Sequence, residues 1–227
     1  MLQLCTIALD VVNTRSNGSS GTQGLQRIIE CRKKVIEIDE RASSHLRESS
    51  VCASMKDYLE HWNWHMHRSY VVSELCRPVL TRRELRDENA RSLRVVCIEA
   101  LADTVDAFLN LHNLTAFART SWAAVHRSLS SALLLGILKE PMRSERVYSL
   151  IQRLIMVMSS MEYSEVSEVP GPVARAVAAL ERLNINDSDG HTRGESWSTT
   201  STSESSSPHA QMYHILWGTP SSGASVG

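Results

Sequence analysis

The sequence predicts an all-α protein, a multi-helix bundle of about six to eight helices, and two observations support this fold class. Apolar residues recur at spacings of three and four along most of the stretch from residue 25 to residue 184, which is the period of a helix with one buried face. The same stretch contains no useful length of the polar and apolar alternation that marks a half-buried strand. A chain of 227 residues is long enough to bury one large helical core.

The composition divides the chain into three regions. Residues 1–24 are expected to form a short helix, at Leu2–Val12, and then a flexible loop rich in Ser, Gly, Thr and Asn. Residues 25–185 are expected to form the helical domain. Residues 186–227 are expected to be a disordered tail, because Ser and Thr dominate a segment that is too polar to bury a core.

The first helix of the domain is predicted from the apolar pattern between Leu25 and Leu46. It contains the basic run Arg32-Lys33-Lys34, for which two interpretations exist, a localisation signal and a solvated helix face. We expect the solvated face, because three charges within one helical turn are common on exposed helix surfaces.

Local signals set the ends of the next helix. Ser54 followed by Asp57 is a weaker form of the capping box, which marks a helix start. The helix is expected to run to about Cys76, because Pro78 disfavours the helical conformation in the residue before it. A stripe on this helix is predicted to be buried, and it consists of Met55, Tyr58, Leu59, Trp62, Met66, Ser69, Tyr70 and Ser73.

The fold is expected to be organised around two central helices, which follow a short helix capped by Thr81 and Glu84. The apolar stripe of the first central helix consists of Leu93, Cys97, Ala100, Leu101, Thr104, Phe108 and Leu111. The second runs from Trp122 to Leu138, and its second half is apolar nearly all round, which predicts a position deep in the core. We expect Trp122 to be a buried anchor between the two, so that Trp122→Ala would cost about 3–5 kcal/mol.

Two further helices complete the predicted domain. Pro141 ends the second central helix, and Ser144 is a suitable N-cap for the next. Pro172 suits the first turn of a last helix.

Charge and cysteine usage exclude several classes of protein. The formal net charge is −1, which does not predict direct binding to nucleic acid or to an anionic membrane. The five cysteines have no paired spacing, so neither a disulfide framework nor a zinc module of close cysteine pairs is predicted. No run approaches the roughly 20 apolar residues of a membrane-spanning helix, and Met1–Val12 lacks the charge pattern of a signal peptide.

A search for catalytic and metal-binding patterns finds only weak candidates. His61 and His65 lie one helical turn apart, a spacing that lets two imidazoles share a metal, and His67 and two tryptophans lie beside them. The adjacent Glu of the zinc-protease motif is absent, and so are a glycine-rich phosphate loop and a nucleophile elbow. We therefore expect no catalytic residue, no metal ligand and no cofactor, and we do not expect an enzyme.

Three stretches, taken in order, resemble one known family. They are Tyr70–Leu80, which contains Arg77-Pro78, then Ser92–Phe108, and then Trp122–Leu138. Together they resemble the C-terminal half of the regulatory region, called the middle homology region, of fungal binuclear zinc-cluster transcription factors. The resemblance covers about residues 25–184, and it implies an all-helical domain that regulates transcription, with a small-molecule effector or a protein partner.

The resemblance implies a nuclear transcription regulator, and the genomic setting of many such factors makes a secondary-metabolite gene cluster an expected target. The six closely spaced cysteines of the family's DNA-binding module are not in this chain. Any association with DNA is therefore expected to be indirect, through a partner protein or an oligomer. The alternative is a non-catalytic helical scaffold or protein-interaction domain in the cytosol. Arg77 is expected to cap its helix or to pair with a carboxylate between Glu84 and Glu88.

Overall fold

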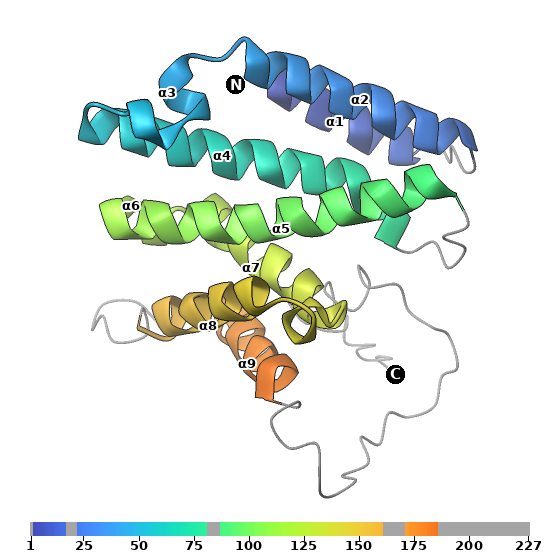
Figure 1. Ribbon diagram of the computed structural model, residues 1–227. Helices are drawn as coiled ribbons and strands as arrows, with labels where there is room; N and C mark the ends of the chain where they lie inside the picture. The colour runs from blue at the N-terminus through green and yellow to red at the C-terminus, as the bar shows by residue number, and fades with distance from the viewer. Residues whose placement is uncertain (1, 17–21, 81–86, 161–170, 186–227) are drawn as a thin grey trace, which may run out of the picture.

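Two long antiparallel helices, α4 (Met55–Cys76) and α5 (Glu88–Leu114), lie side by side at the centre of the protein (Figure 1). The computed structural model describes residues 2–16, 22–80, 87–160 and 171–185. Within these ranges the secondary structure is entirely helical and no strand occurs, which confirms the predicted all-α fold class. The predicted tail at 186–227 and the capping box of Thr81 and Glu84 lie outside the described residues.

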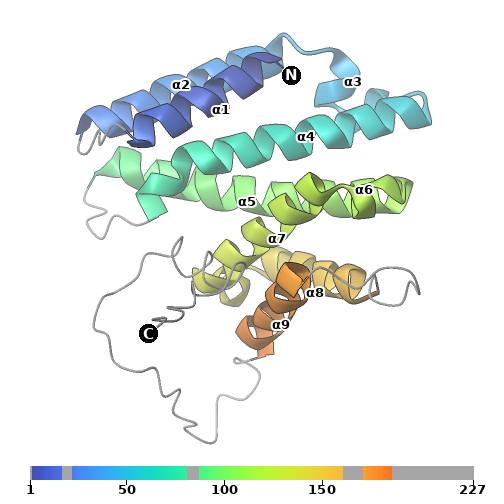
Figure 2. The same cartoon turned by 180° about the vertical axis from the view of Figure 1, so that it is seen from behind.

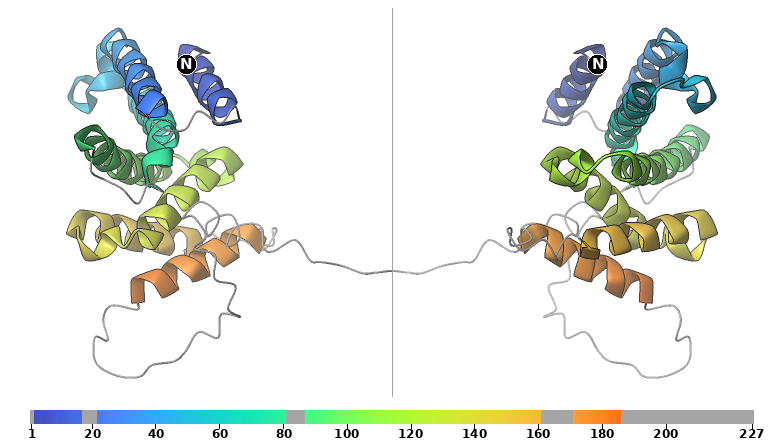
Figure 3. Two further views of the ribbon diagram at one scale, coloured as in Figure 1. Left: turned by 90° about the vertical axis from the view of Figure 1, so that its right-hand side faces the viewer. Right: turned by 90° about the vertical axis from the view of Figure 1, so that its left-hand side faces the viewer.

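The remaining helices form layers on either side of the central pair. α1 (Leu2–Ser16) and α2 (Thr22–Glu40) pack against α4, away from α5. α7 (Trp122–Ile137) crosses beneath α5, and Figure 3 shows it between α5 and the pair α8 (Glu145–Ser160) and α9 (Gly171–Ile185). Seen from behind, α9 lies in front of α8 (Figure 2).

Short helices connect these long elements. α3 (Ser44–Arg47) and the 3₁₀ turn η1 (Ser49–Val51) lead into α4, and η2 (Arg77–Leu80) follows it. α6 (Phe117–Thr120) and η3 (Glu140–Met142) flank α7. Counting α3 and α6, which are single turns, the described residues contain nine α-helices.

The core follows the two central helices, as their patterns predicted. Every residue of the predicted α5 stripe is buried, and Phe108 has no exposed surface. α7 is buried continuously from Ser128 to Gly136. Gly136 brings α9 close, because a Cβ atom at this position would lie 3.0 Å from Cδ1 of Leu183.

Several helix ends confirm the local signals in the sequence. Ser54 and Asp57 form a reciprocal capping box at the start of α4. α4 ends at Cys76 as predicted, but the reason given for it was wrong, because Arg77 keeps helical backbone angles (φ −49°, ψ −39°) and continues into the 3₁₀ turn that contains Pro78. The Ser144 hydroxyl accepts a hydrogen bond from the amide of Val147 at the start of α8, at 3.4 Å. Pro172 lies in the first turn of α9. Local side-chain chemistry therefore determines these boundaries.

Two predicted boundaries in the N-terminal third were wrong. The expected loop up to residue 24 is helical at both ends, because α1 continues to Ser16 and α2 begins at Thr22. The burial of Leu4 against its neighbours shows that packing stabilises α1 despite weak local propensity. The predicted helix at 25–46 breaks after Glu40, where the chain turns back toward α4 to form α3.

The predicted stripe of α4 was partly wrong as well. Met55 is 58% exposed, whereas Trp64, which was not part of the stripe, is buried. The physical reason is that α4 packs on two sides, against α1 and α2 on one and against α5 on the other. A helix buried on two sides does not show one simple apolar stripe.

Trp122 is 45% exposed, so its predicted role as a buried anchor was wrong. Trp122 is the first residue of α7, and the first buried residue of this helix is Ala124. Its nearest ring partner is His126 on the same helix, at 5.9 Å between centroids. We therefore expect Trp122→Ala to lower the free energy of unfolding by less than about 1 kcal/mol, measured by urea denaturation. A loss of several kcal/mol would show that the ring is covered in solution.

Candidate binding site between α3, α4 and α5

A pocket of about 440 Å³ lies between the α3–η1 segment, α4 and α5, and we call it the histidine pocket. Its volume is within the range of small-molecule sites. The lining residues are Arg47, Glu48, Ser49 and Ser50 from the α3–η1 segment, His61, Trp62, His65 and Arg68 from α4, and Asp103, Asp106 and Ala107 from α5.

The helical spacing of His61 and His65 brings their rings together, with centroids 4.3 Å apart. His61 is buried, and its Nδ1 atom donates a hydrogen bond to the backbone carbonyl of His45, at 3.0 Å. The Nε2 atom of His65 is buried and has no hydrogen-bond partner among the described residues. Burial is the main cause that lowers the pKa of His65, and the positive charge of Arg68 contributes. A neutral His65 can therefore offer a hydrogen bond to a bound molecule.

Two charged residues of the pocket, Arg68 and Asp103, are paired with other helices. Arg68 forms an ion pair with Asp39 of α2, and the same carboxylate accepts a hydrogen bond from the indole of Trp64, at 2.8 Å. Asp103 pairs with Arg146 of α8, at 2.7 Å. The pocket therefore offers polar side chains beside the indole of Trp62, on which a bound ring could stack.

His67 does not join the other two histidines of α4. Arg127 of α7 donates a hydrogen bond to Nδ1 of His67, and its guanidinium also lies over the ring of Tyr70, at 5.2 Å from the centroid. Because the guanidinium can only donate, His67 is the acceptor and is neutral here. Burial first, and the charge of Arg127 second, lower the pKa of His67 to about 4.

This depressed pKa makes the stability of the protein depend on pH. Between about pH 6.5 and pH 4 the unfolded chain binds a proton at His67 that the folded chain does not, so stability falls as the pH falls through this window. The free energy of unfolding should fall between pH 7 and pH 4.5 in the wild type, and in His67→Gln this fall should be smaller by about 1–2 kcal/mol. This range allows for the partial exposure of the His67 ring. Urea denaturation at several pH values measures this. Identical pH dependence in both proteins would contradict the assignment.

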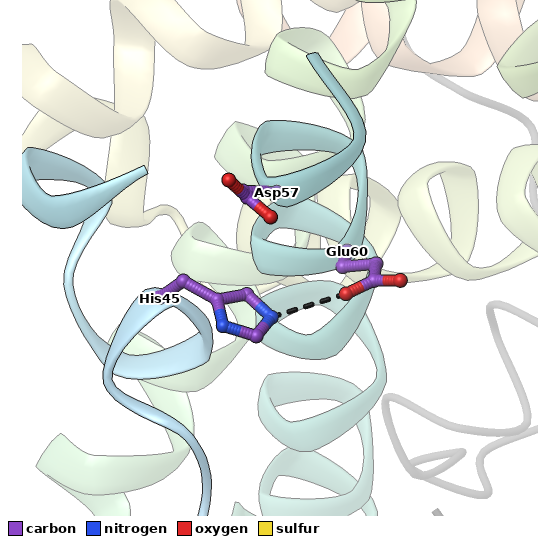
Figure 4. Close-up of side chains that lie close together, drawn as sticks. All are labelled: His45, Asp57 and Glu60. Atoms are coloured by element: carbon purple, nitrogen blue, oxygen red, sulfur yellow. Dashed lines mark hydrogen bonds and ion pairs between the residues drawn. The ribbon is translucent and has the colours of Figure 1, made fainter. Parts of the chain in front are cut away.

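A second group of side chains lies next to the pocket. His45 of α3 faces Asp57 and Glu60 in the first two turns of α4, and the ligand atoms of the three lie within 4.8 Å of one another (Figure 4). Sequence reasoning missed His45, because it lies 12 and 15 positions from its partners and no motif marks it. Only the turn between α2 and α4 brings it there.

Comparison with known proteins gives no relative for this chain. No protein-family model, no curated protein and no solved structure matches it. Among the described residues, no helix is long and apolar enough to cross a membrane.

Proposed function

We propose that this protein is a fungal-type transcription regulator that acts through its helical domain and has no catalytic role. The proposal comes from the resemblance of Tyr70–Leu80, Ser92–Phe108 and Trp122–Leu138 to the regulatory region of fungal zinc-cluster factors. The observation that carries it is their packing: the three stretches lie on α4 with η2, on α5 and on α7, and each packs against the next.

The Arg77-Pro78 motif, which carries much of the resemblance, lies at the junction of α4 and η2. Arg77 is 7% exposed and pairs with Glu74 one turn earlier. Its expected roles were to cap its helix or to pair with a carboxylate between Glu84 and Glu88, and that pairing stays a prediction. Of that predicted range, residues 84–86 lie outside the described residues. The ion pair of Arg77 and Glu74 therefore lies within one helical turn at the C-terminal end of α4.

The proposed mechanism is regulation by binding. We assign the binding of a small-molecule effector to the histidine pocket. The pocket has a volume that suits a small ligand, and its walls contain His65 for a hydrogen bond and Trp62 for stacking. Contact with DNA is indirect, through a protein partner, since the chain lacks the cysteine pairs of the family's DNA-binding module. The nucleus and the promoters of a secondary-metabolite gene cluster are the proposed location and targets.

The test is the location of the tagged full chain in a fungal cell, combined with chromatin immunoprecipitation. Nuclear accumulation with enrichment at discrete promoters would support the proposal, and loss of that enrichment on removal of a partner would establish indirect binding. Phe108→Ala, which weakens the core, serves as a destabilised control and should reduce this enrichment. A cytosolic signal without chromatin enrichment would overturn the proposal.

A second candidate function is a cytosolic helical scaffold, and one observation favours it. Phe117, the first residue of α6, is 71% exposed, and Trp122, the first residue of α7, is 45% exposed. Exposed aromatic residues are common at protein interfaces. Under this alternative, Phe117→Ser would release bound proteins from the tagged chain without changing its stability.

A further inference from the structure

Three metal-ligating side chains converge where α3 meets α4. The Nε2 atom of His45 and the carboxylates of Asp57 and Glu60 lie within 4.8 Å of one another, and they come from two separate helices (Figure 4). His45 and Asp57 are partly buried, and Glu60 is exposed, so an ion can reach all three without opening the fold.

We propose that His45, Asp57 and Glu60 bind a divalent transition-metal ion, with Zn²⁺ as the probe, that joins α3 to the start of α4. One imidazole nitrogen and two carboxylate oxygens are ligands that zinc accepts, and a water molecule would complete a tetrahedral site. The proposal does not depend on the function proposed above.

Other hydrogen bonds hold the Asp57 carboxylate and the backbone of His45 in place. The Oδ2 atom of Asp57 accepts hydrogen bonds from the amides of Ala53 and Ser54, at 3.0 and 2.9 Å, and this leaves Oδ1 for an ion. The backbone carbonyl of His45 accepts the hydrogen bond from the buried His61 ring, at 3.0 Å. Such supporting hydrogen bonds orient metal ligands and reduce the cost of ordering them.

The present partners of Glu60 can be exchanged for an ion. His45 Nε2 and Glu60 Oε2 are 3.0 Å apart, and Lys56 Nζ lies 3.6 Å from Glu60 Oε1. A divalent ion would take the place of the Nε2 proton, which moves to Nδ1 or to solvent, and two coordinate bonds would replace this hydrogen bond. Lys56 is 81% exposed, so its ammonium group can turn into solvent when the ion enters.

The site would couple metal binding to the histidine pocket. One wall of the pocket consists of Arg47, Glu48, Ser49 and Ser50, which begin two residues after His45 in the chain. An ion that ties His45 to α4 would hold this wall in position. The proposal therefore gives the α3–η1 segment a role that its short helices, which have no buried residues, do not explain.

Equilibrium dialysis of the purified full chain against ZnCl₂ tests the site. We expect one Zn²⁺ per chain in the wild type, and an affinity for Zn²⁺ that is about tenfold or more lower in both His45→Gln and Glu60→Gln. Asp57 is left unchanged because it also caps α4. His112→Gln, which removes a histidine of α5, and Lys56→Gln, which removes the competing cation, serve as controls and should retain the ion.

A second measurement, of thermal stability, distinguishes the loss of the zinc site from a failure of the variants to fold. Excess Zn²⁺ should raise the thermal midpoint of the wild-type chain and of both controls, and leave the midpoints of His45→Gln and Glu60→Gln unchanged. Circular dichroism before titration verifies that the variants are folded. Absence of Zn²⁺ binding by the wild type, or equal binding by His45→Gln and His112→Gln, would overturn the proposal.

Discussion

Phe108→Ala is expected to lower the free energy of unfolding by about 3–5 kcal/mol, measured by urea denaturation. The Phe108 ring has no exposed surface and lies on the face of α5 that forms the core. Alanine at this position removes a large apolar side chain and leaves a cavity that the packed helices can only partly fill.

The only other phenylalanine of the chain provides a matched control for this prediction. Phe117 is 71% exposed, so Phe117→Ala makes the same chemical change without creating a cavity. We expect it to change the free energy of unfolding by less than about 0.5 kcal/mol. Equal losses in the two variants would show that the described core is not the core in solution.

Arg77→Met is expected to cost about 2–4 kcal/mol, because it removes the buried guanidinium that forms an ion pair with the carboxylate of Glu74. The side chain of Arg77 is 9% exposed and that of Glu74 is 22% exposed, so water screens the remaining charge poorly. The double variant Glu74→Gln with Arg77→Met removes both charges, and it should recover at least half of the loss in a double-mutant cycle.

An exposed ion pair serves as the control for Arg77→Met. Nη2 of Arg146 and Oδ1 of Asp103 are 2.7 Å apart, but the two side chains are 55% and 41% exposed. We expect Arg146→Met to cost less than about 1 kcal/mol, because solvent screens this pair. If Arg77→Met cost no more than Arg146→Met, burial would not be what makes the Glu74 pair important.

The candidate site was predicted only in part. The helical spacing of His61 and His65 placed their rings on one side of α4, and the structure shows them in contact. The sequence could not predict the position of His45. His45 reaches α4 only because the chain turns after Glu40, and no local pattern marks that turn. The partners of His67 and Arg68 lie on α7 and α2, far away in the sequence.

The sequence by itself determined the helical class, the buried face of α5 and several helix ends. Each of these depends on interactions within a few residues, such as the period of apolar residues or the capping box of Ser54 and Asp57. Only the tertiary structure decided which helices cover each other. In the folded protein Trp122 is exposed, α4 is buried on two sides, and His45 contacts Glu60. The sequence alone does not determine these outcomes, because they depend on packing between distant segments.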